Sequence, residues 1–217
     1  MKTYKVKITG TMPLLLHSDN IEWADRMEDW RKNPKNKQKS KAGDDRTPPW
    51  RWIGCLYHDK SILTIPCENI MRCIMEGAKD VPTGKGKKTF KAQSQSGIHS
   101  GSYQWPLLVA GKTIAMKGIN ALLDEDRSFA QQIKAVSNLG FSLFMKRARV
   151  GQAKHIRVRP RFDEWATIGE LIVTDVQITK EILEDILDIG GRLKGLGDWR
   201  PGSPTPGPFG MFTAEVE

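Results

Sequence analysis

The sequence predicts an α+β fold built around an antiparallel sheet. Residues 4–8 (Tyr-Lys-Val-Lys-Ile) alternate between polar and apolar, which indicates an opening strand with one wet face. Apolar residues spaced by three and four after Pro66 and again after Thr179 predict two helices. Short strand-like runs follow each helix. This order favours a ferredoxin-like (RRM-like) βαββαβ core with inserted basic hairpins and a C-terminal glycine-rich loop.

The remaining elements follow from local patterns. The first helix has Ile70, Cys73, Ile74 and Ala78 on its inner face, and the second has Ile182, Ile186, Ile189 and Leu193. We expect hairpins at residues 52–65 and 107–116, partly helical structure over 119–139, and strands at 165–173 and 209–216.

We expect a single domain over residues 1–217, since this length suits one sizeable core. Residues 18–49 are polar and basic, so they predict a mobile basic insertion that buries little. Residues 79–104 predict a basic loop, and residues 190–210 a glycine-rich loop.

The formal net charge is +9 and is unevenly distributed. Residues 146–161 hold seven Lys or Arg and no acid, whereas residues 163–188 hold eight acids and one lysine. In the first stretch, residues 144–150 and 154–161 predict a hairpin hinged at Gly151-Gln152, with one cationic and one partly apolar face. This segregation favours a polyanion on the basic face.

Several classes of protein are disfavoured. No apolar run approaches the roughly 20 residues that span a bilayer, and the N-terminus lacks a signal-peptide core, so we expect a cytoplasmic protein without a membrane partner. Cys55, Cys67 and Cys73 have neither disulfide-framework nor zinc-site spacing. No phosphate-loop, metalloprotease or hydrolase motif occurs, so we expect no metal and no cofactor.

The C-terminal loop is the most informative segment. Seven glycines and four prolines lie within residues 190–210. Free backbone N–H groups in such loops form concavities that bind anions. Arginine suits phosphate and an indole suits a base, and Arg192, Lys194, Trp199 and Arg200 lie here. The alternative is a surface loop without a ligand.

Three segments resemble the RAMP superfamily (repeat-associated mysterious proteins) of CRISPR ribonucleoproteins, most closely its RNA-coating backbone subunits. They are ITGTMPLLLHS at the first strand, TIPCENIMRCIMEGAK at the first helix and IGGRLKGLGDWRPGSPTPGPFGMF at the end. The Asp-Trp-Arg-Pro step at 198–201 departs from the usual pattern, and the chain is shorter than many backbone subunits. A stand-alone phage or mobile-element relative is equally compatible.

The residues and the resemblance together define a predicted RNA-binding set of cations, glycines and one aromatic. Its members are Lys85, Lys87, Lys88, Lys146, Arg147, Arg149, His155, Arg157, Arg159, Arg161, Arg192, Lys194, Gly195, Gly197, Trp199 and Arg200.

Three functional hypotheses follow. The first is a non-catalytic subunit that holds guide or CRISPR RNA by its backbone, possibly with single-stranded DNA as a second ligand and with other copies of itself as partners. The second is a metal-independent endoribonuclease. Some RAMP proteins cleave RNA with a residue near the end of the first strand, where His17 and Asp19 lie here. The third is an inhibitory or capping mimic of such a subunit.

Overall fold

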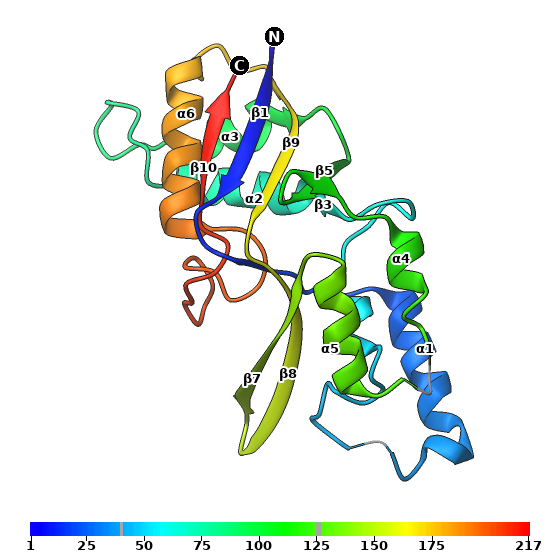
Figure 1. Ribbon diagram of the computed structural model, residues 1–217. Helices are drawn as coiled ribbons and strands as arrows, with labels where there is room; N and C mark the ends of the chain where they lie inside the picture. The colour runs from blue at the N-terminus through cyan, green and yellow to red at the C-terminus, as the bar shows by residue number, and fades with distance from the viewer. Residues whose placement is uncertain (40, 125–126) are drawn as a thin grey trace.

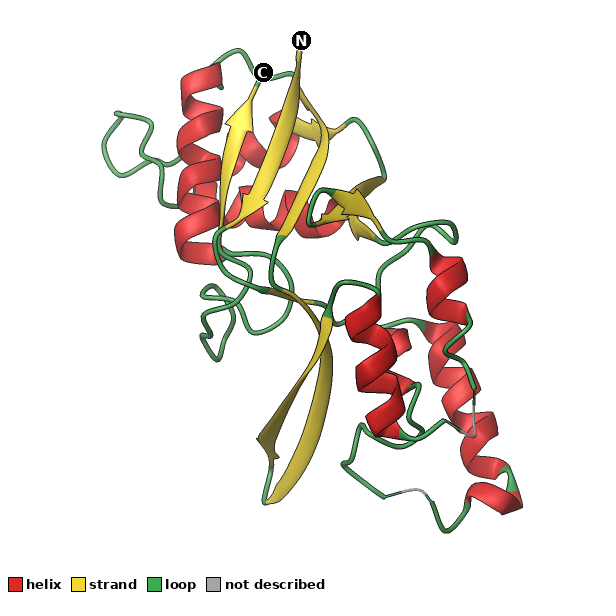
Figure 2. Cartoon of the chain, viewed as in Figure 1, coloured by secondary structure: helices red, strands yellow, loops and turns green. Residues whose placement is uncertain are grey.

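The computed structural model describes residues 1–39, 41–124 and 127–217, and shows a mixed α+β protein with antiparallel sheets (Figures 1 and 2). Its larger sheet has the strand order β10-β1-β9-β5-β3, with β4 paired to β9 and β6 paired to β5. These strands are β1 (Lys2–Gly10), β3 (Thr64–Pro66), β4 (Ile98–Ser100), β5 (Gln104–Val109), β6 (Lys112–Thr113), β9 (Trp165–Val173) and β10 (Phe212–Val216). The two chain ends lie side by side at the edge of this sheet.

Helices α2 (Cys67–Ala78) and α6 (Lys180–Ile189) pack against the sheet, and the short α3 (Lys91–Gly97) lies beside them. Ile74 of α2 and Ile186 of α6 meet Ile8 and Phe212 of the sheet in one apolar cluster. Burying these side chains is the main source of stability, at about 1.5–3 kcal/mol for each. The predicted inner face of α2 is confirmed, because Ile70, Cys73, Ile74 and Ala78 are all buried.

The other face of the sheet is open to solvent. In β1, Tyr4, Val6 and Ile8 are buried while the intervening lysines are exposed, as the alternation predicts. Open-sheet RNA-recognition modules stack bases on aromatic residues of this face. Here the outward positions of β1, β5, β9 and β10, all within the described residues, include no aromatic side chain. These strands therefore lack the aromatic platform of such modules.

A second part of the molecule lies below the sheet in Figure 1. Strands β7 (Ser142–Val150) and β8 (Ala153–Phe162) form a long hairpin with a turn at Gly151-Gln152, as predicted, and β2 (Leu14–Leu15) pairs with β8. Beside it lie α1 (Ile21–Lys32), α4 (Met116–Asn120), α5 (Phe129–Asn138) and two 3₁₀ helices, η1 (Pro34–Asn36) and η2 (Arg51–Cys55).

The base of the hairpin is anchored in an aromatic cluster. Phe162 of β8 stacks on Phe141 with ring centroids 4.9 Å apart, and Phe141 meets Trp52 edge-on at 5.8 Å. The Trp52 Nε1–H donates to Gln132 Oε1 of α5 at 3.3 Å, and Gln132 donates to the Leu122 carbonyl. Since these groups are buried and hydrogen-bonded, they hold the hairpin base in one orientation.

Two segment predictions need correction. Residues 18–49 contain α1 and η1, so this segment has regular structure that was not expected; it buries Trp30, Asn36, Asp44 and Asp45, while most of its other described residues are exposed. Their mobility stays a prediction. Residues 79–104 are not one loop, because α3 and β4 occupy residues 91–100 and leave a loop closed by the Pro82–Thr89 bridge.

Smaller differences concern element boundaries. Residues 52–57 are predicted as a hairpin arm, but residues 51–55 form the 3₁₀ helix η2. Helix α6 begins after the predicted N-cap Thr179 but buries Leu183 and Leu187 beside Ile186. Leu193 is exposed because the chain leaves the α-helical path in a π-helical turn, η3 (Gly190–Lys194). Ser40, Glu125 and Asp126, within the predicted insertion and the predicted partly helical stretch, lie outside the described residues.

None of the helices in the described ranges combines the length and the apolar character that crossing a bilayer requires.

Candidate nucleic-acid interface

An open groove of about 690 Å³ separates the β7–β8 hairpin from the glycine-rich loop. We call it the hairpin groove. Its cations come from the hairpin and its far wall comes from the loop, at Asp198, Trp199 and residues 203–205. Five predicted cations line it: Lys146, Arg147, Arg149, Arg157 and Arg159. The structure thus brings the basic ribbon and the C-terminal loop together, although they are far apart in the sequence.

Strand register determines which side chains share a face of the hairpin. Phe144 lies opposite Arg159, and Lys146 lies opposite Arg157. Directly opposed residues of an antiparallel pair point to the same side of the sheet. The alternation predicted for β8 is confirmed, because Val158 is buried while Arg157 and Arg159 are partly exposed.

Trp199 is the aromatic centre of the groove. Its ring lies 5.4 Å from Phe209 and 6.2 Å from Phe144, and Lys146 Nζ sits over it, 2.8 Å from the ring centroid. Its backbone has φ +48°, which is uncommon for a residue with a side chain. The Trp199 N–H donates to Asp198 Oδ1 at 2.8 Å, which helps to hold this conformation.

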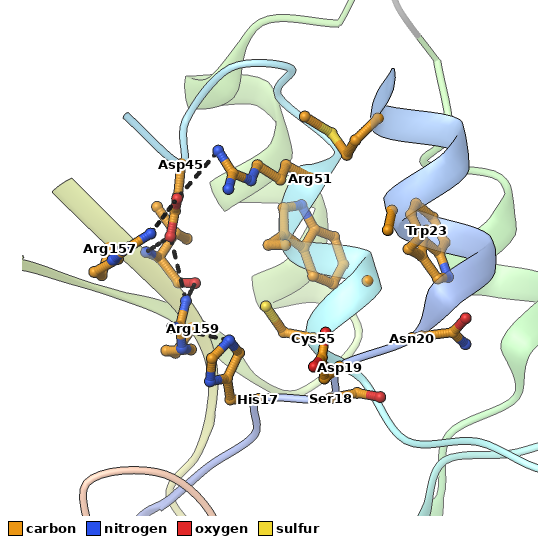
Figure 3. A pocket seen from close by; sticks show the side chains of 15 residues that line it. His17, Ser18, Asp19, Asn20, Trp23, Asp45, Arg51, Cys55, Arg157 and Arg159 are labelled. Atoms are coloured by element: carbon orange, nitrogen blue, oxygen red, sulfur yellow. Dashed lines mark hydrogen bonds and ion pairs between the residues drawn. The ribbon is translucent and has the colours of Figure 1, made fainter. Parts of the chain in front are cut away.

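A buried carboxylate organises the arginines (Figure 3). Asp45 is 5% exposed and forms ion pairs with Arg51 at 3.2 Å and with Arg157 and Arg159 at 3.3 Å each. Its backbone N–H also donates to the Ile156 carbonyl, so segment 43–45 runs along the edge of β8. Sequence reasoning missed Asp45. The signal was the Asp44-Asp45 step, the only acids between Lys32 and Arg51.

The Arg159 guanidinium is largely buried and bonded to several groups of the protein itself. Its side chain is 11% exposed. Nε donates to Asp198 Oδ2 at 2.8 Å, Nη1 donates to Asp45 and to the Val158 carbonyl, and Nη2 lies 3.2 Å from His17 Nε2. These contacts use most of the five guanidinium N–H donors. Arg159 therefore orients its neighbours more than it offers donors to a ligand.

His17 lies at the meeting point of the hairpin groove and two smaller hollows of about 160 and 150 Å³. Burial, followed by the neighbouring Arg159 guanidinium, lowers the pKa of His17 below its ordinary value. A guanidinium can only donate, so Nε2 of the neutral ring accepts from Arg159 and the proton resides on Nδ1. Asp19 lines the 160 Å³ hollow but not the groove.

The glycines of the loop serve chain packing. Gly195 and Gly197 have φ near +70°. A Cβ at Gly197 would overlap the Leu15 carbonyl oxygen, and one at Gly210 would overlap that of Leu196. The close approach at Gly197 and Gly210 is therefore to the protein's own backbone. Whether a ligand also lies near them stays a prediction.

The loop cations are paired away from the groove. Arg192 pairs with Asp188 at 2.7 Å and Lys194 with Asp80. Arg200 donates to Glu76 Oε2 at 2.9 Å and to the Lys194 carbonyl, so it ties the loop to α2.

The remaining predicted residues lie in three other places. Lys85, Lys87 and Lys88 belong to the closed loop beyond α2 and line none of the three hollows described above. Arg161 pairs with Asp163 at 2.7 Å near the base of the hairpin. The His155 ring lies against Gly43, where an added Cβ would come within 2.8 Å of it.

Neither protein-family models nor curated protein sequences gave a match to this chain. Within the described residues, no three His, Cys, Asp or Glu side chains gather as a metal site, and the three cysteines carry free thiols.

Proposed function

We propose that the protein binds single-stranded RNA in the hairpin groove, as a subunit of a ribonucleoprotein assembly. The observation that carries this is the groove itself, where five cations and the Trp199 ring share one hollow. Cations that follow a backbone, together with aromatics on which bases stack, are the usual means of holding a single strand with little sequence preference. The positive φ of Trp199 supports the same reading, since strained residues cluster at ligand sites.

We propose in addition that the larger sheet is a ferredoxin-like core of RAMP type. Support comes from its order β10-β1-β9-β5, in which α2 lies between β1 and β5 along the chain and α6 lies between β9 and β10. That order and those crossovers match the βαββαβ plan. The guide or CRISPR RNA implied by the resemblance, and a cytoplasmic location, belong to this proposal.

The nuclease alternative receives less support from the geometry. A general base needs a free lone pair within hydrogen-bond reach of the proton that it removes. The Nε2 lone pair of His17 faces Arg159, so His17 could act as a base only after that contact breaks.

The test compares matched pairs of charge removals. Lys146 and Arg147 line the groove and form no ion pair with any described residue, so Lys146→Ala with Arg147→Ala removes two cations that no carboxylate neutralises, one of them in contact with the Trp199 ring. Lys112→Ala with Lys117→Ala removes two exposed cations, on β6 and α4, that do not line the groove. Fluorescence anisotropy with a labelled U12 RNA, at several salt concentrations, measures affinity and the salt slope.

We expect the groove pair to weaken binding and to flatten the log–log salt slope by about one to two units, while the control pair changes little. Equal effects of both pairs would mean that binding follows net charge and not the groove. If this protein has no affinity for free RNA but binds another protein tightly, the capping mimic is favoured.

A further inference from the structure

A carboxylate lies among the cations of the hairpin groove. Asp198 is 34% exposed, and it lines both the groove and the adjoining 150 Å³ hollow beside Tyr57 and Asn69. A carboxylate repels phosphate, so a groove that served phosphates alone would bind more tightly without it. Asp198 holds the Trp199 backbone and pairs with Arg159, and its exposed part in addition suits a ligand group that donates a hydrogen bond.

Asp198 has acceptor capacity that the protein leaves unused. Oδ1 accepts the Trp199 N–H at 2.8 Å, and Oδ2 accepts the Arg159 Nε–H at 2.8 Å. A carboxylate has about four lone-pair sites, so these two bonds leave room for a ligand donor.

A hydrogen-bond donor stands next to this acceptor. His17 Nδ1, which carries the ring proton because Nε2 faces Arg159, lies 3.8 Å from Asp198 Oδ2. The pair thus offers one donor and one acceptor side by side. A hydroxyl group both donates and accepts, a phosphate oxygen only accepts, and a deoxyribose C2′ does neither.

We propose that Asp198 and His17 read the ribose 2′-hydroxyl, so that the groove selects RNA over single-stranded DNA. This inference rests on the proposed function. The nucleotide concerned is the one whose base stacks at Trp199, because Trp199 directly follows Asp198 and the sugar of a stacked base lies beside the ring. The proposal concerns binding only, and neither Asp198 nor His17 takes part in a chemical step.

The experiment compares three labelled 12-mers that share the same base: U12 RNA, dU12 DNA and 2′-O-methyl U12. We expect RNA to bind about tenfold to a hundredfold more tightly than DNA, the range for a hydroxyl bonded to a charged partner. The 2′-O-methyl strand should bind as weakly as DNA, because the methyl group removes the donated hydrogen. A comparison of U12 with A12 and C12 RNA tests whether a base edge is read instead.

The matched variants are Asp198→Asn and Asp163→Asn. Each removes one negative charge, and Asp163 pairs with Arg161 outside the groove. Asp198→Asn should tighten the binding of both strands, through lost repulsion, while the RNA-to-DNA ratio falls at least threefold. Asp163→Asn should leave the ratio unchanged.

The outcomes separate the two proposals. Equal binding of RNA and DNA by the unmodified protein, or a preference that follows the base and not the sugar, overturns the ribose inference and leaves the proposed function standing. Absence of binding to all strands overturns both. The RNA-to-DNA affinity ratio of the unmodified protein tests the sugar preference even if Asp198→Asn does not fold.

Discussion

Gly197 gives the sharpest test of whether the glycine-rich loop is built for packing or for a ligand. The residue has φ +76°, and a Cβ there would overlap the Leu15 carbonyl oxygen. That same carbonyl accepts the Asp198 N–H at 2.8 Å. In Gly197→Ala the left-handed backbone costs about 1–2 kcal/mol. The displaced hydrogen bond adds about 1 kcal/mol.

The expected loss is therefore about 2–3 kcal/mol of unfolding free energy. For a chain of this size that corresponds to a melting temperature lower by roughly 4–12 °C. Differential scanning calorimetry measures it. Gly111→Ala is the matched control, because Gly111 has φ +78° in the β5–β6 turn with nothing within 4 Å of the added Cβ. Gly111→Ala should therefore lose only the free energy of placing a side chain on a left-handed backbone.

Two results would refute this reasoning. If Gly197→Ala lowers the melting temperature no more than Gly111→Ala, the overlap with Leu15 costs nothing. If Gly197→Ala melts normally but binds RNA poorly, the glycine serves the ligand and not the fold.

Three further predictions concern charge and order. The lowered pKa of His17 means that the unfolded chain takes up this proton at a higher pH than the folded protein, so folding stability falls as pH drops through and below the ordinary value of 6.5. Urea unfolding at pH 7.5 and 5.5 should show a smaller pH effect in His17→Gln, and an equal effect would contradict this. Asp45→Ala should lower the unfolding free energy by about 3–5 kcal/mol, because it leaves three arginines without their buried partner. Asp163→Ala, which breaks an exposed pair, should cost at most about 1 kcal/mol in the same urea titration. Trypsin should cut first within residues 35–41, and U12 RNA should protect them; earlier cleavage elsewhere would count against a mobile insertion.

The strands and the basic hairpin could be predicted because their signals are local. The alternation in β1, the apolar spacing in α2 and the turn at Gly151-Gln152 each depend on neighbouring residues alone. Helix η2 lies largely within a predicted hairpin arm, and its packing against β8, which the local sequence does not show, accompanies the different outcome.

The site was predictable only in outline. Composition indicated a cationic ribbon and a loop with an aromatic residue, and these do share one groove. The partners of the cations could not be predicted, because Asp45 lies over a hundred positions from Arg159 in the sequence yet pairs with it in the fold. Gly195 and Gly197 belong to the predicted RNA-binding set because a sequence shows where a glycine stands without showing which atoms approach it.

The distribution of ion pairs decides which cations remain for a ligand. Arg159 and Arg200 each pair with a partly buried carboxylate, so a phosphate bound there would have to replace an existing partner at equal or greater gain. Arg192 pairs with Asp188 at the surface, where such a pair contributes little to stability. Lys146 and Arg147 form no ion pair with a described residue, and both line the groove, Lys146 with its ammonium over the Trp199 ring. Net charge alone would rank all five residues equally. The ion pairs instead leave the favourable phosphate contacts on the hairpin. The substitution of Lys146 and Arg147 is therefore a sharper test of RNA binding than substitution of the loop cations Arg192, Lys194 and Arg200.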